Sequence, residues 1–127
     1  MSMRTMVFVA ALAGVAVGAA GVQLLHAQVK PPAYVVGEID IADPEAFEKA
    51  YVPNAAKAVR DGGGKYLVVG GRSVGLYGEP PKRIAIMAFE SLDKAEAAFA
   101  SPAYKAAKRE GDKYAKFRIY AVEGVPQ

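Results

Sequence analysis

The longest apolar run of the chain lies at its N-terminus. Met6 to Leu25, MVFVAALAGVAVGAAGVQLL, contains no charged residue and follows Arg4. A short apolar core behind a positive charge, with a small residue such as Ala27 after it, is typical of a secretory signal peptide. We therefore predict that residues 1–27 direct export to the periplasm or the medium and are removed after Ala27. The alternative is an uncleaved membrane anchor, because about twenty apolar residues can span a bilayer.

Beyond this segment the apolar residues form short β-branched runs, which are typical of strands. Residues 28–33 are expected to form an extended spacer that contains two prolines. The predicted main strands are Tyr34–Ile41, Tyr66–Val69, Arg83–Glu90 and Phe117–Glu123. Ser73–Tyr77 is expected to be a further short strand or hairpin arm, followed by a turn at residues 78–81.

Apolar residues at helical spacing predict helices between these strands. Asp43–Pro44 and Ser101–Pro102 each begin a helix, because aspartate and serine are good N-caps and proline is tolerated at the first helical position. Pro53 lies inside the pattern of the first helix and should kink or split it. Ser91 caps another helix, which follows the third main strand.

The resulting order of elements, β-α-β-(β)-β-α-α-β, predicts an α+β domain over residues 34–124. It is the ferredoxin-like βαββαβ pattern, in which an antiparallel sheet carries helices on one face. The strand sequences VVGEIDI, YLVV and IAIMAF are apolar on both faces. A sheet covered on one side should have a polar second face, so burial of both faces requires a partner. The simplest partner is a second copy, and we predict a homodimer.

Five glycines surround the second main strand in the stretch DGGGKYLVVGGR. A phosphate-binding loop connects a strand to the N-terminus of a helix, where free N–H groups face the anion. Here a helix ends at the glycines and a strand follows, and neither GxGxxG nor GKS occurs. We expect these glycines to cap the helix and to allow close approach of the backbone.

Composition excludes several classes of site. The chain has no cysteine, and its one histidine lies in the predicted leader at His26. Disulfides are therefore excluded, as is an ordinary zinc site in the mature chain, and we predict neither a metal nor a cofactor. Cleavage of the predicted leader would remove Arg4, and the mature chain would then have 15 of the 16 basic residues against 13 acidic ones. This balance is too even to indicate a nucleic-acid partner.

Two carboxylates are candidates for catalysis. Glu38 and Asp40 alternate onto one face of the first strand, roughly 7 Å apart. Carboxylates at this spacing can hold a hard cation or act as acid and base. The alternative is a pair in water at the rim of the sheet, because buried carboxylates need partners.

Aromatic residues suggest a ligand pocket. Tyr51 and Phe99 lie on inward helical stripes and can roof a pocket between helices and sheet, with Tyr104 completing an apolar wall. The arginines that can hold a carboxylate are Arg72, Arg83 and Arg109. The alternatives are ordinary core packing for the aromatic residues and a solvated basic face for the helix around Arg109.

Several stretches of the sequence, taken in order, resemble a known family. AYVVGEIDIADPEAF, GGKYLVVGG and FESLDKAEAAFASPAYKAAK, followed by a last strand ending in VEG, are similar in this order to the family called domain of unknown function 1330. The resemblance runs from about Ala33 to Gly124. It implies membership of the dimeric α/β-barrel superfamily, in which the sheets of two ferredoxin-like protomers face each other. The chain departs from the family pattern at Phe99, often a tryptophan, and at Tyr77, often acidic, so any chemistry carried by those residues in relatives is in doubt here.

The family implies no settled activity. The superfamily includes cofactor-independent monooxygenases, isomerases and haem enzymes; for haem, the predicted mature chain offers only tyrosine as an axial ligand. Our first hypothesis is an exported homodimer that binds a small, partly apolar ligand. The second is a cofactor-independent enzyme, monooxygenase-like or isomerase-like, in which Glu38 or Asp40 accepts a proton and a tyrosine donates one. The third is a non-catalytic structural or interaction module of the cell envelope.

Overall fold

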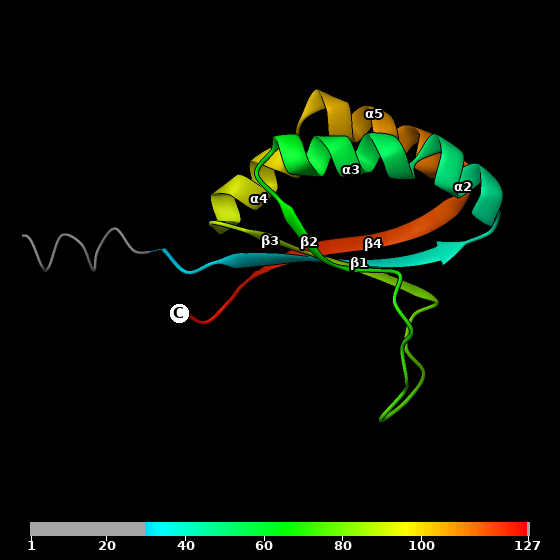
Figure 1. The fold of residues 1–127 in the computed structure, drawn as a ribbon, viewed down its shortest axis with the longest axis horizontal. Coiled ribbons are helices and arrows are strands. Elements are labelled where there is room, and N and C mark those ends of the chain that lie inside the picture. The colour runs from blue at the N-terminus through cyan, green and yellow to red at the C-terminus, as the bar shows by residue number, and fades with distance from the viewer. Residues whose placement is uncertain (1–29, 127) are drawn as a thin grey trace, which may run out of the picture. The chain divides into compact units, whose positions relative to one another are not determined.

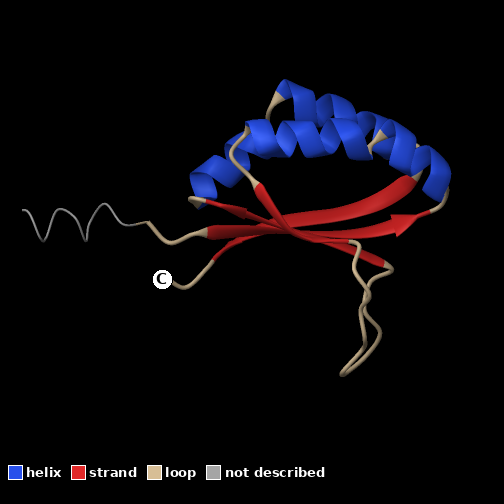
Figure 2. Cartoon of the chain, viewed as in Figure 1, coloured by secondary structure: helices blue, strands red, loops and turns tan. Residues whose placement is uncertain are grey.

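Residues 30–126 fold into an antiparallel sheet with their helices on one face (Figures 1 and 2). The computed structural model describes residues 30–126, so the predicted leader lies outside the described residues. The strands are β1 (Ala33–Ile41), β2 (Lys65–Val69), β3 (Arg83–Phe89) and β4 (Ala115–Glu123). The helices are α2 (Pro44–Ala50), α3 (Val52–Asp61), α4 (Leu92–Phe99) and α5 (Pro102–Gly111).

The sheet has the strand order β2-β3-β1-β4, and every neighbouring pair is antiparallel. The predicted ferredoxin-like topology of the protomer is therefore confirmed. Among residues 30–126, no helix is long and apolar enough to cross a membrane.

The predicted break in the first helix is confirmed, and it determines the position of Tyr51. Asp43 caps α2 by accepting a hydrogen bond from the Ala46 N–H at 3.1 Å. Pro53 is the second residue of α3, where a missing N–H costs nothing, and Tyr51 is the junction between the two helices. The side chain of Tyr51 is buried at this junction, beneath the helical layer.

The glycines after α3 have the geometric role that the sequence predicts. Gly63 has a φ of +93°, the left-handed conformation that commonly ends a helix. A Cβ on Gly64 would lie 2.6 Å from carbon atoms of both Phe89 and Val59. Only glycine allows the backbone to pass this close to the core as the chain enters β2.

The predicted short strand at Ser73–Tyr77 is wrong. Residues 70–82 form a loop without ladder pairing, which extends from the sheet on the side away from the helices (Figure 1). An isolated strand has no stability without a neighbour to accept and donate its backbone hydrogen bonds. Val74, Leu76 and Tyr77 are all exposed on this loop, which we call the β2–β3 arm.

Helices cover only one face of the described sheet, although both faces carry apolar residues. Val35, Ile39, Met87 and Phe89 face the helices and are buried in the core. The face without helices, which we call the open face, has apolar residues in the centre and charged residues toward one end. Its apolar residues are Tyr34, Val36, Val68, Ile84, Ile86, Tyr120 and Val122, as the strand register shows. Strands that are apolar on both faces are thus present, and the structure leaves the apolar part of one face uncovered.

Candidate functional site

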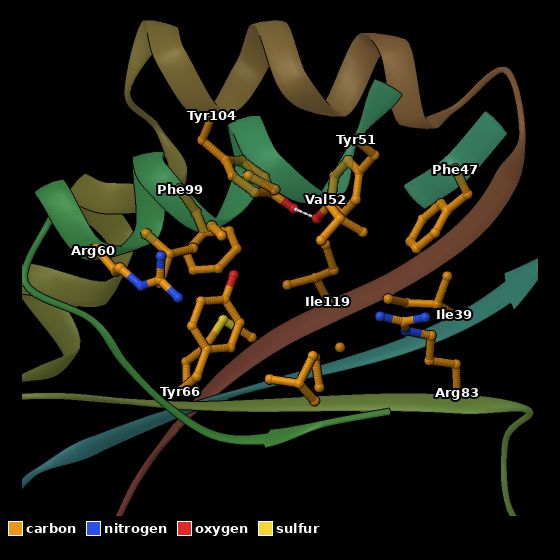
Figure 3. Close-up of a pocket in the computed structure, with 17 residues that line it drawn as sticks. Ile39, Phe47, Tyr51, Val52, Arg60, Tyr66, Arg83, Phe99, Tyr104 and Ile119 are labelled. Carbon is orange, nitrogen blue, oxygen red and sulfur yellow. Dashed lines mark hydrogen bonds between the residues drawn. The ribbon is translucent and has the colours of Figure 1, made fainter. Parts of the chain in front are cut away.

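A cavity of about 170 Å³ lies between the sheet and the helices, and Figure 3 shows its lining. Most of the lining is apolar and comes from strands β1 to β4 and from the inner sides of the helices. The residues are Gly37, Ile39, Phe47, Tyr51, Val52, Ala55, Ala56, Val59, Arg60, Tyr66, Val69, Arg83, Ala85, Met87, Phe99, Tyr104 and Ile119. Apolar concavities with a few polar groups are the usual form of small-molecule sites.

The cavity exists because two small residues meet at the centre of the sheet. Gly37 of β1 lies directly opposite Ala85 of β3 in the strand register. A Cβ built on Gly37 would have no neighbour closer than the Ala85 carbonyl oxygen at 3.8 Å. The floor of the cavity therefore lies where Gly37 has no side chain, between the bulkier inward residues Val35 and Ile39 of the same strand.

A pair of tyrosine hydroxyl groups forms the polar part of the roof. The oxygens of Tyr51 and Tyr104 are 2.7 Å apart and share a hydrogen bond. The two residues are only 9% and 4% exposed, and their rings meet edge to face at 6.3 Å. Burial raises the pKa of Tyr104 to about 12. Burial, and then the proximity of Tyr104, raise the pKa of Tyr51 strongly, so both phenols stay protonated at neutral pH.

Further aromatic rings hold this pair in place. The Phe99 ring lies 4.4 Å from the Tyr104 ring, and the Phe47 ring stacks on Tyr51 at 5.0 Å. The Phe117 ring lies 4.9 Å from the Tyr51 ring and 6.0 Å from the Phe47 ring, so the three rings form one cluster. Packed aromatic side chains of this kind fix both hydroxyl groups relative to the cavity.

The two arginines of the cavity lie at opposite ends of it in Figure 3 and differ in their partners. Arg83 donates to a Glu48 carboxylate oxygen at 2.6 Å, and its guanidinium carbon lies 5.4 Å from the centre of the Phe47 ring. Arg60 lies over the Tyr66 ring at 5.9 Å. Within residues 30–126, Arg60 has no ion pair with a carboxylate.

Four of the six predicted ligand-binding residues meet at this cavity: Tyr51, Arg83, Phe99 and Tyr104. Arg72 does not, because it lies on the exposed β2–β3 arm. Arg109 lines a separate shallow groove between α3 and α5. Helical periodicity identifies inward residues, but it cannot say which exposed arginine lies near the mouth of a cavity.

Glu38 and Asp40 share one face of β1 as predicted, but that face is the open face and not the cavity. The Tyr120 hydroxyl donates to a Glu38 carboxylate oxygen at 2.8 Å. The Asp40 carboxylate is 64% exposed and lies 3.4 Å from the Lys82 ammonium group. Neither predicted catalytic carboxylate therefore faces the cavity, because alternation along β1 sends both side chains away from the helices.

Three further residues that matter for the chemistry of the cavity, Gly37, Arg60 and Tyr66, were not among the predicted site residues. A lone glycine in a β-branched strand was the available signal for Gly37, since glycine in a strand often marks close approach or missing bulk. Arg60 and Tyr66 gave no such signal, because their proximity depends on the turn between α3 and β2. The part of the chain that the structure describes contains no cluster of three metal-binding side chains.

Solved structures with a similar fold come from several bacteria. RPA0582, a protein of unknown function from Rhodopseudomonas palustris, has a TM-score of 0.61 and 16% identity, over 76% of this chain and 84% of that one. SnoaB, a cofactor-independent oxygenase from Streptomyces nogalater, has a TM-score of 0.54 and 12% identity, over 76% of this chain and 96% of that one. A protein of unknown function from Bacteroides thetaiotaomicron, described as a possible oxidoreductase, has a TM-score of 0.54 and 9% identity, over 75% and 99%.

At these identities the likenesses show a shared fold alone. A search of the curated proteins found no significant match. The family comparison is more specific, because the model described as Domain of unknown function (DUF1330) matches residues 32–125, from just before β1 to just after β4. The match contains the sheet, the helices and every residue of the cavity, and the chain belongs to the DUF1330 family.

Proposed function

We propose that the protein is exported and, as a homodimer, binds a small, partly apolar ligand in the cavity between helices and sheet. The observation that carries the proposal is the floor of Gly37 and Ala85, where an ordinary pair of strand residues would fill the space. An unfilled volume in a core costs stability, by roughly 20–30 cal/mol for each Å³. A cavity roofed by two oriented hydroxyl groups recovers that cost when a ligand occupies it.

Native mass spectrometry of the full chain, produced without an N-terminal tag and taken from the cell envelope, tests the proposal. We expect the mass of a chain that begins at Gln28, assembled as a dimer. We also expect an additional mass from a bound ligand, which is lost on mild collisional activation. A dimer without added mass, which also gains no thermal stability from small apolar compounds, would contradict ligand binding. A chain that retains its first 27 residues would show that the leader is an anchor.

A cofactor-independent enzyme is the second candidate. The observation in its favour is the Tyr51–Tyr104 pair, which places a phenolic donor at the roof of the cavity. The described residues that line the cavity include no carboxylate and no histidine, and the raised pKa values of both tyrosines make them poor bases at neutral pH. Incubating the protein with its identified ligand in air separates the candidates, because an enzyme converts the ligand and a binding protein returns it unchanged.

The homodimer proposal is supported by the open face. Helices cover only one face of this sheet, so no second layer covers Val36, Ile84 and Ile86 on the open face. The β2–β3 arm extends beyond the same face and exposes Leu76 at 87% and Tyr77 fully. Two open faces packed together would bury both sets of apolar side chains, with each arm available to contact the other protomer.

Replacing Ile86 with lysine should convert the dimer into a monomer. Ile86 lies at the centre of the open face, between Val36 and Val68 in the register, so a charge there would be buried without a partner. Sedimentation velocity or native mass spectrometry measures the assembly. Ala103→Lys, on the exposed side of α5, is the matched control and should remain dimeric. A dimer in both variants would place the interface elsewhere.

A further inference from the structure

We propose that the ligand is a small monocarboxylate whose charged end is held by Arg60 and Tyr66, at the end of the cavity between α3 and β2. This inference rests on the proposed binding function and adds the chemical class of the ligand. It follows from the charges and donors that the cavity leaves without partners.

At the mouth of the cavity, the exposed side chain of Arg60 carries a positive charge that no described acidic residue pairs with. Arg60 and Arg83 are the charged residues among the described lining, and no carboxylate is part of that lining. Glu48 neutralises Arg83 through a hydrogen bond of 2.6 Å, so the anion-binding capacity of Arg83 is already used within the fold. Arg60 retains its full charge, because within residues 30–126 it contacts the face of the Tyr66 ring and no acidic group. A ligand with one negative charge would restore neutrality.

Tyr66 supplies a second donor at the same end. Its hydroxyl group makes no hydrogen bond to any residue that the structure describes, although the residue is half-buried and lines the cavity. Figure 3 shows this hydroxyl pointing up toward the helices, on the cavity side of the Arg60 guanidinium. A guanidinium group and a phenol on one side of a site suit the planar, two-oxygen geometry of a carboxylate. A phosphate monoester carries up to two charges and would leave an excess negative charge.

The rest of the cavity determines the body of the ligand. The course from Arg60 to the Tyr51–Tyr104 hydroxyl pair is lined by Phe99 on the helical side and by Gly37, Ala85 and Met87 on the side of the sheet. This course is apolar until it reaches the hydroxyl pair. We therefore infer a compact apolar or aromatic body attached to the carboxylate, with room for one hydroxyl or carbonyl oxygen at the far end.

The test compares 4-ethylbenzoate with 4-ethylbenzamide, which have the same body and differ in charge. Isothermal titration calorimetry at low salt with the full chain should show the carboxylate binding about tenfold more tightly, the usual advantage of a charge-assisted hydrogen bond. Arg60→Met keeps the apolar stem and removes the charge, so it should weaken binding of the carboxylate and reduce the preference to near unity. Arg109→Met removes an arginine of the separate groove and should keep the preference.

The outcomes separate this inference from the proposed function through a third variant, Gly37→Val, which fills the cavity floor. If the amide binds as tightly as the carboxylate, and Gly37→Val abolishes both, the carboxylate inference is overturned and the binding site stands. If Gly37→Val leaves both affinities unchanged, the cavity is not the site and both proposals fail. A tenfold preference that Arg60→Met and Gly37→Val remove, but Arg109→Met does not, supports both.

Discussion

Replacing Gly37 with valine should make the protein more stable and at the same time abolish ligand binding. A glycine within a strand has more freedom in the unfolded chain than any other residue, and in this strand it leaves an unfilled volume in the core. Filling a cavity of this kind commonly stabilises a protein by about 0.5–2 kcal/mol. For a domain of this size, each kcal/mol raises the melting temperature by roughly 4–8 °C.

Valine fits at this position for local reasons. The nearest atoms to the new Cβ would be the Ala85 carbonyl oxygen at 3.8 Å and the Ala85 Cβ at 3.9 Å, which are ordinary contacts. The backbone of Gly37 is ordinary strand, and β-branched residues favour that conformation. The two methyl groups would point into the cavity, where they occupy the floor on which the ligand rests.

Urea denaturation and thermal melting measure the stability, and calorimetry with 4-ethylbenzoate measures the binding. Gly64→Val is the matched control, because a Cβ at Gly64 would lie 2.6 Å from atoms of Phe89 and Val59. The same substitution should therefore destabilise the fold there by about 1–3 kcal/mol. A Gly37→Val variant that is less stable than the wild type would show that the volume above Gly37 is not open.

Gly37 also illustrates what the sequence could and could not predict. The strand around it was evident from its β-branched residues, and the cap-and-proline pairs at Asp43–Pro44 and Ser101–Pro102 fixed two helix starts. Such signals are local, so they can be found by inspection of a few residues. The cavity depends instead on Gly37 meeting Ala85, a register between strands that are far apart in the chain. No local pattern contains that information.

The charged residues show the same limit. Alternation placed Glu38 and Asp40 on one face of β1, which is a local property and holds in the structure. Which face the helices cover was ambiguous in the first half of β1, because Tyr34 and Val36 on the outward face are as apolar as Val35 on the inward face. The meeting of Arg60 with Tyr66 depends on a left-handed turn at Gly63, whose direction the sequence does not specify. The β2–β3 arm was mistaken for a strand because its β-branched and aromatic residues favour strands, whatever neighbour is available.

Removing one hydroxyl group of the Tyr51–Tyr104 pair should cost more stability than removing both. In Tyr104→Phe the Tyr51 hydroxyl loses its partner at 2.7 Å while it stays buried, and a buried polar group without a partner costs about 1–3 kcal/mol. Tyr51→Phe leaves Tyr104 in the same condition. The double variant has two apolar rings of nearly unchanged shape, and it should be close to the wild type in stability.

A double-mutant cycle measures this difference. Urea denaturation of the wild type, both single variants and the double variant gives an interaction energy, which should exceed about 1 kcal/mol. Tyr114→Phe is the control, since that tyrosine lies at the rim and makes no side-chain hydrogen bond to a described residue. Additive losses in the double variant would mean that the two hydroxyl groups act independently.

The same pair should make the fold sensitive to alkali. Tyr104 has a pKa of about 12 in the fold against 10.0 in an exposed tyrosine, and Tyr51 is shifted further in the same direction. Between pH 10 and 12 the unfolded chain therefore loses these protons while the folded chain keeps them. Stability is unaffected below pH 10 and falls as the pH rises through this window, by at most about 1.4 kcal/mol per pH unit for each group. In the double phenylalanine variant, the free energy of unfolding should decline less steeply with pH. In the wild type, absorbance should show two phenols that ionise only as the protein unfolds. If both phenols titrate near pH 10 in the folded protein, water reaches them freely, and the roof of the cavity is open to solvent.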